Sequence, residues 1–122
     1  MTDKDNKKPI HNSILFISSD VIGRGENIEL GNLLMQKFLH EVGEHPEKPD
    51  TIVMMNNGVK LVKEDSLAFG ELKQLEEQGV DILACGTCLS RLGLSESVAV
   101  GKASNMRDIA DILLTASKVL SF

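Results

Sequence analysis

Short apolar runs recur along the chain and are separated by polar segments rich in turn-forming residues. Three of these runs are dense enough to predict strands that are buried on both faces, and a fourth run is shorter. The predicted strands cover 13–19, 51–55, 80–84 and 97–100. Residues 59–65 alternate between apolar and polar, which predicts either a short extended piece or a loop.

Between the runs, apolar residues recur at the three- and four-residue spacing of amphipathic helices. In the first such segment, 28–42, the recurring positions are Leu30, Leu33, Leu34, Phe38 and Val42. Gly43 is predicted to end this helix, and Ser66 to begin a second one that runs to residue 79. A short helix is predicted at 87–92, and Asn105 with Asp108 is predicted to open a last helix that ends near residue 114.

The alternation of strands and helices predicts an α/β fold. We expect a three-layer α/β/α sandwich with a mostly parallel sheet of four to five strands, joined by right-handed crossovers. The 122 residues fit a single domain. We assign that domain to 13–122, behind a flexible, charged tail over 1–12.

Composition and charge narrow the possible functions. Apolar residues make up 42% and charged residues 25% of the chain, which is typical of a globular protein. The net charge is −5 with both signs interleaved, which argues against binding to nucleic acid. No apolar run approaches the ~20 residues that span a bilayer, and the polar N-terminus lacks the apolar core of a secretion signal. We therefore expect a cytoplasmic protein with no membrane partner.

Both cysteines of the chain lie in one stretch, ILACGTCLSRLG, where a predicted strand ends. Ligands of open α/β sheets bind beyond the carboxyl ends of the strands, so Cys85 and Cys88 lie where a site is expected. A structural zinc needs four ligands, and the three histidines lack the spacing to complete one. No metal held within one chain is therefore expected, a zinc shared between subunits stays open, and no cofactor is predicted. A persulfide carrier, a dithiol redox pair and two thiols that merely pack in the core remain open.

Several neighbours favour a reactive thiol. A helix that begins directly after Cys85 would present unpaired N–H groups, which lower the pKa of a nearby thiol. Gly86 permits close approach, Thr87 offers a hydrogen bond, and Arg91 is the nearest cation. The loops after the first two strands are expected to contribute the rest of the site rim: Gly23, Gly25, Asn27, Asn56 and Asn57.

The segment CGTCLSRLG resembles the cysteine motif of the DsrE-like proteins, which are small sulfur-relay and sulfurtransferase-like proteins. GRGENIELGNLLMQKFL, NNGVKLV, LKQLEEQGVDILACGTCL and VAVGKASNMRDI resemble, in the same order, the DsrE-like domain of the selenium-metabolism protein YedF. The resemblance implies an α/β/α domain that assembles into trimers or hexamers and holds sulfur as a cysteine persulfide. It places Cys85 at the sulfur-accepting position and Cys88 at that of a second or resolving thiol.

The resemblance also implies partners. Sulfur donor and acceptor proteins are expected, and the cargo is sulfur or selenium. The longer relatives carry a TusA-like domain. Three alternatives follow for this chain: the TusA-like partner acts in trans, it lies outside this sequence, or it is unnecessary. The function predicted first is a sulfur carrier or sulfurtransferase-like protein. A non-catalytic assembly module and a CxxC dithiol redox protein are the alternatives.

Overall fold

A computed structural model describes residues 12–122. The tail expected over 1–12 therefore lies outside the described residues, apart from Asn12. The described part contains a parallel five-stranded sheet in the order β5-β4-β3-β2-β6. Its strands are β2 (Ser13–Ile17), β3 (Thr51–Met54), β4 (Asp81–Cys85), β5 (Lys102–Ser104) and β6 (Lys118–Ser121). Every neighbouring pair is parallel.

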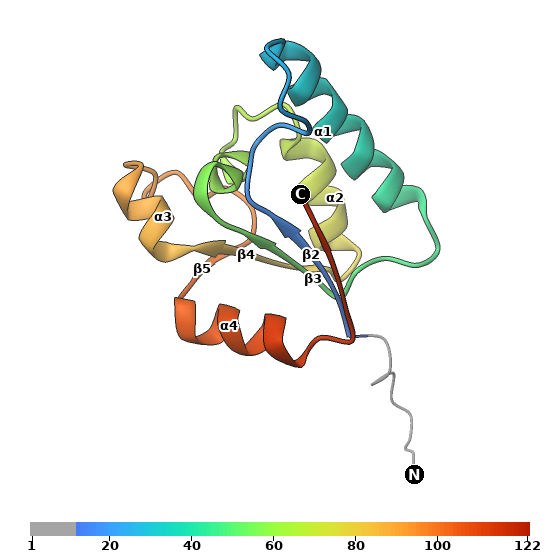
Figure 1. The fold of residues 1–122 in the computed structure, drawn as a ribbon, viewed down its shortest axis with the longest axis vertical. Coiled ribbons are helices and arrows are strands. Elements are labelled where there is room, and N and C mark those ends of the chain that lie inside the picture. The colour runs from blue at the N-terminus through green and yellow to red at the C-terminus, as the bar shows by residue number, and fades with distance from the viewer. Residues whose placement is uncertain (1–11) are drawn as a thin grey trace.

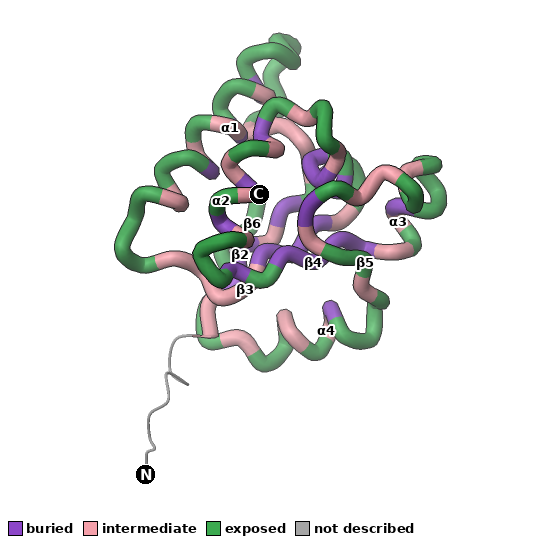
Figure 2. The backbone as a smooth tube through the Cα atoms, turned by 180° about the vertical axis from the view of Figure 1, so that it is seen from behind, coloured by how far each residue is buried: buried purple, intermediate pink, exposed green. Residues whose placement is uncertain are grey.

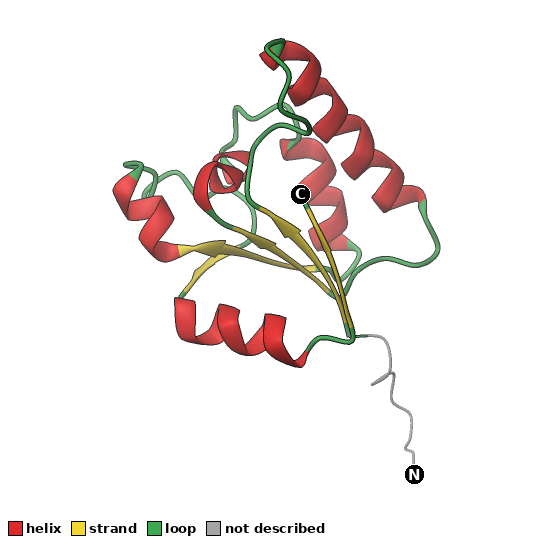
Figure 3. Cartoon of the chain, in the orientation of Figure 1, coloured by secondary structure: helices red, strands yellow, loops and turns green. Residues whose placement is uncertain are grey.

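Helices cover both faces of this sheet. They are α1 (Ile28–Glu44), α2 (Phe69–Glu77), α3 (Gly86–Arg91), α4 (Met106–Thr115) and the 3₁₀-helix η2 (Asn56–Val62). Figure 1 shows α1 and α2 over one face and α4 under the other, while α3 extends the end of β4. The three layers are plain in the secondary-structure colouring of Figure 3. The predicted α/β fold with a parallel sheet is confirmed.

The core follows the three central strands. The apolar runs of β2, β3 and β4 are buried almost throughout, because helices cover both of their faces. Figure 2 shows this buried zone running along the sheet, while the outer turns of the helices are exposed. The helices contribute Met35, Leu39, Leu72, Leu75 and Ile109, all fully buried.

The buried face of α1 is not the one that the leucine spacing suggested. Gly31, Met35 and Leu39 face the core, whereas Leu30, Leu33 and Leu34 are 50%, 41% and 40% exposed. The helix also continues through Gly43 to Glu44, so the predicted glycine cap is wrong. Because α1 is apolar on two sides, the spacing alone did not identify which side packs on the sheet.

The fourth predicted strand is displaced along the chain. Residues 97–100 form no strand, although Val100 is buried and Ala99 N–H donates to Val62 O over 2.9 Å. Gly101 then turns the chain with a φ of +73°, and the more polar β5 follows it. The apolar run packs as a loop, and β5 pairs with β4 at the edge of the sheet.

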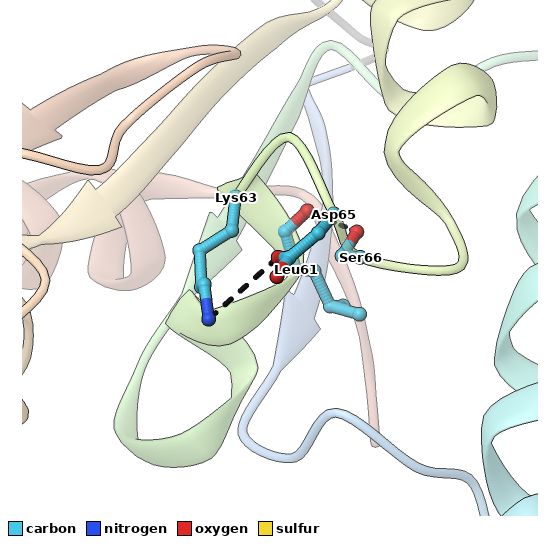
Figure 4. A network of polar contacts seen from close by, with 4 residues as sticks. All are labelled: Leu61, Lys63, Asp65 and Ser66. Atoms are coloured by element: carbon cyan, nitrogen blue, oxygen red, sulfur yellow. Dashed lines mark hydrogen bonds and ion pairs between the residues drawn. The ribbon is translucent and has the colours of Figure 1, made fainter.

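The segment after β3 also differs from the prediction. It forms η2 and not an extended piece, and four of its seven residues are buried. Ser66 does not open α2, which begins at Phe69; its hydroxyl instead donates to Leu61 O over 2.8 Å. Figure 4 shows this turn, in which Lys63 Nζ also lies 3.6 Å from Asp65 Oδ1.

The chain ends in a strand that the sequence did not predict. All four residues of β6 are exposed, because β6 lies at the edge of the sheet beside β2. A fully exposed strand of four residues leaves no alternating or continuous apolar pattern to recognise. Backbone bonds from Phe122 N to Phe16 O and from Ser18 N to Phe122 O, both 2.8 Å, extend the pairing to the last residue.

Gly58 fixes η2 against the carboxyl end of β2. A Cβ atom at this position would lie 2.3 Å from Ile17 O, closer than any real contact. The same carbonyl oxygen accepts a hydrogen bond from Met55 N over 3.0 Å. The start of η2 therefore lies directly on the sheet only because residue 58 has no side chain.

Gly58→Ala is accordingly expected to lower the free energy of unfolding by about 1–3 kcal/mol, because the backbone must move away from Ile17 O. Urea unfolding followed by circular dichroism measures this. Gly25→Ala is the matched control: a Cβ there meets nothing within 4 Å, so its effect stays within about 0.5 kcal/mol. Equal stability of the two variants would contradict the close approach.

Candidate functional site

The two cysteines lie where β4 passes directly into α3. Cys85 is both the last residue of β4 and the N-cap of α3. Its Sγ accepts a hydrogen bond from Cys88 N over 3.3 Å, in the place that a Ser or Asp oxygen takes at other helix starts. The CxxC thus forms a single turn that brings its two side chains together.

The two thiols differ in exposure, and in the opposite sense from the expected one. Cys85 is 2% exposed and belongs to the core, whereas Cys88 is only partly buried. Cys85 was expected to be the reachable thiol. Its position at the end of a central strand explains the difference, because helices cover both faces of that strand.

The second wall of the site comes from η2. Asn56 N–H donates to Cys88 Sγ over 3.1 Å, and Asn56 adopts a left-handed φ of 51°. Because β3 and β4 are parallel neighbours, the segments that leave them meet at one edge of the sheet. The sequence placed Asn56 at the site rim, but it did not show that the contact would come from the backbone N–H.

A pocket of about 210 Å³ opens beside Cys88. Its lining consists of Asn56, Thr87, Cys88, Arg91 and Leu92. Four of these five residues were predicted from the sequence, and the structure brings them together. Leu92 was missed, and the available signal was its place four residues after Cys88, one helical turn away.

The other predicted rim residues do not line this pocket. Asn27 caps α1, with its Oδ1 accepting from Leu30 N over 3.0 Å. Gly23 and Gly25 lie exposed in the loop before α1, and Asn57 is exposed on η2. Gly86 begins α3, where an added Cβ would lie 3.1 Å from Ser104 O of β5. Gly86 therefore supports the site by allowing α3 to start close to the neighbouring strand.

The surroundings of Cys88 disfavour its thiolate form. Burial raises the pKa of Cys88 above its ordinary 9.0, and the hydrogen bond with the Cys85 side chain raises it further. The backbone N–H of Asn56 opposes both effects. Arg91 lines the same pocket but is not among the causes of the shift. The resting Cys88 thiol therefore holds its proton at neutral pH.

Other parts of the described structure offer less chemistry. Within residues 12–122, no group of three His, Cys, Asp or Glu side chains is placed to hold a metal ion. A mostly apolar hollow of about 250 Å³ lies between α1, β2 and β6, and it contains no cysteine. No helix among the same residues has the length and apolar character needed to cross a membrane.

The fold and site define a class: a small parallel α/β protein with two thiols at the carboxyl edge of its sheet. The DsrE/DsrF-like family model matches residues 32–122. The chain therefore belongs to the DsrE/DsrF-like family. A comparison with curated proteins gave no match.

Solved structures share this fold at low sequence identity. The YchN protein from E. coli is 19% identical with a TM-score of 0.62, and the match covers 91% of this chain and 99% of YchN. The conserved protein of unknown function BT1422 from Bacteroides thetaiotaomicron is 16% identical with a TM-score of 0.66, covering 96% and 100%. MTH1491 from Methanobacterium thermoautotrophicum, also of unknown function, is 18% identical with a TM-score of 0.64, covering 90% and 97%. These likenesses establish the architecture alone.

The raised pKa of Cys88 predicts how this thiol reacts with pH. Iodoacetamide labelling of Cys88 should be slow at neutral pH and rise with a midpoint above 9.0, because the thiolate is the nucleophile. Peptide mass mapping after timed labelling at each pH gives the midpoint.

Cys85→Ala should shift that midpoint to lower pH, because it removes the Cys85 hydrogen bond and charge that raise the pKa of Cys88. A midpoint that stays unchanged or moves to higher pH in Cys85→Ala would contradict the contact between the thiols.

Proposed function

We propose that this protein is a sulfur or selenium carrier that holds its cargo as a persulfide on Cys88. The observation that carries the proposal is the position of Cys88: the residue lines a pocket, and its thiol accepts Asn56 N–H and contacts a second thiol. Membership of the DsrE/DsrF-like family supports the same chemistry. Cys85 is its partner thiol, since 2% exposure leaves no room for a donor protein to reach it.

The loading step is an exchange between sulfur atoms. The Cys88 thiolate attacks the outer sulfur of a donor persulfide, RS–SH. The new bond joins Cys88 Sγ to that outer sulfur, and the donor leaves as the thiolate RS⁻. No oxidant or reductant is consumed, because the transferred sulfur keeps its oxidation state. The reverse exchange passes the sulfur to an acceptor thiol.

The pocket provides the surroundings that such a persulfide needs. The added sulfur would extend from Cys88 beside the exposed Arg91 and Thr87. Arg91 carries a permanent positive charge that attracts an anionic persulfide, and Thr87 can donate its hydroxyl hydrogen. Leu92 contributes apolar surface to the lining.

The same chemistry requires a protein that donates sulfur and a protein that accepts it. The resemblance to the longer relatives supports a TusA-like protein acting in trans as one of these two partners. The resemblance to YedF supports selenium as an alternative cargo. Two free thiols with no disulfide fit a reducing compartment, and a cytoplasmic location is part of the proposal.

Loading with glutathione persulfide tests the proposal. Intact-mass spectrometry of the quenched protein should show the addition of one sulfur atom, which dithiothreitol removes. The adduct should be absent from Cys88→Ser, because this variant lacks the attacking sulfur, and present in Cys85→Ser. Serine keeps an oxygen that can cap α3 in Cys85→Ser, so this variant is the matched control. If the adduct instead forms on Cys88→Ser and is absent from Cys85→Ser, then Cys85 is the residue that accepts the sulfur.

We further propose that the carrier works as a homo-oligomer, a trimer or hexamer. The outer side of α1 carries Leu30 and Leu33 opposite the residues that pack on the sheet, and Leu34 is exposed on the flank of the helix. A helix that is apolar on both sides is normally buried on both sides. A second copy that covers the exposed leucines would complete that burial.

Light scattering should then give a mass that is a multiple of 13.3 kDa. The double variant Leu30→Glu/Leu33→Glu should reduce it toward 13.3 kDa, because charges cannot be buried unpaired in an apolar interface. Gln74→Glu, which adds a charge at an exposed position of α2, is expected to leave the mass unchanged. A monomeric wild-type chain would refute the oligomer.

A further inference from the structure

The buried thiol of Cys85 makes polar contacts in addition to its apolar packing in the core. Its side chain turns over the start of α3, accepts Cys88 N–H over 3.3 Å and shares a hydrogen bond with the Cys88 thiol. Cys85 is 2% exposed and belongs to the core cluster, and these two polar contacts are both with Cys88. A sulfur nucleophile is thus held against Cys88 and shielded from solvent.

The surroundings of Cys88 are asymmetric. On its inner side lies Cys85 in a packed core, and on its outer side the pocket of about 210 Å³ is open. A sulfur atom added to Cys88 can therefore only extend into the pocket, because close-packed interiors do not admit another atom. The Cys88 sulfur then stands between the Cys85 thiol and the added sulfur. Thiol–disulfide exchange needs this order of attacking, central and leaving sulfur.

We infer that Cys85 resolves the persulfide on Cys88 and releases the cargo as inorganic sulfide. The inference rests on the proposed persulfide function and adds what becomes of the cargo when no acceptor thiol takes it. Cys85 Sγ bonds to Cys88 Sγ while the bond from Cys88 Sγ to the outer sulfur breaks. The outer sulfur leaves with the electron pair and ends as HS⁻, carrying the proton that Cys85 loses. Selenide leaves in the same way when the cargo is selenium.

Atoms and electrons balance within the protein. The two cysteines are oxidised to a disulfide, and the outer sulfur is reduced to sulfide. A spacing of two residues between the cysteines at a helix start allows this bridge to form. A low-molecular-weight thiol such as glutathione restores the dithiol, since two such thiols reduce the bridge and become a disulfide themselves. The cycle thus requires only a persulfide donor and a cellular thiol.

The experiment follows a single turnover. The full chain is loaded with glutathione persulfide, desalted to remove all small thiols, and incubated without a reductant. Samples taken over time are alkylated for intact-mass spectrometry, and sulfide is measured with a methylene blue assay. In the wild-type protein, the persulfide should decay into an intramolecular disulfide with the release of one equivalent of sulfide. In Cys85→Ser, the persulfide should persist, and sulfide release should be lost.

A second variant tests whether the Cys85→Ser result arises from misfolding. Cys85→Ala keeps an apolar side chain in the core, and it too should load and fail to release sulfide. If the wild-type persulfide is as long-lived as that of Cys85→Ser, the inference is overturned and the carrier function stands. Equal sulfide release from wild type and both variants also overturns it. If the wild-type protein does not form a persulfide at all, both the proposed carrier function and this inference are refuted.

Discussion

The parallel pairing of β3 with β4 is the constraint on which the site depends. Their register, with Met54 opposite Ala84, places the carboxyl ends of both strands at the same edge of the sheet. The chain leaves β3 as η2 and leaves β4 as α3, so the two short helices meet there. The hydrogen bond from Asn56 N to Cys88 Sγ joins them. The absence of a side chain at Gly58 lets η2 lie low enough to make this contact.

Two chemically identical thiols acquire different properties from this arrangement. Cys85 belongs to the strand and is enclosed by the core, whereas Cys88 belongs to the following helix and reaches a pocket. Burial and the neighbouring thiol keep the proton on Cys88, so resting Cys88 is a weak nucleophile at neutral pH. Such a pair is less prone to random oxidation than an exposed thiolate, because oxidation follows thiolate character and exposure.

The single chain leaves apolar surface at its margins. The outer leucines of α1 are exposed, and so are Val119 and Leu120 of the edge strand β6. Edge strands present unpaired backbone groups that proteins normally cover or blunt. One face of the sheet is covered by α4, and Ile109 is the fully buried residue of that helix. Structures that share this fold at 16–19% identity establish the common architecture, while function is decided by the residues at the site.

The sequence by itself determined the layered α/β architecture, because three dense apolar runs bounded by turn residues alternate with segments of helical spacing. It also determined the CxxC at a strand end, and thereby Asn56, Thr87 and Arg91 as neighbours of a thiol. The tertiary structure decided what depends on packing between distant segments. Which side of α1 is buried, the displacement of β5 and the existence of β6 all follow from contacts that no local pattern records. The exposure of Cys88 in place of Cys85 has the same origin, since burial of a strand end is set by helices elsewhere in the chain.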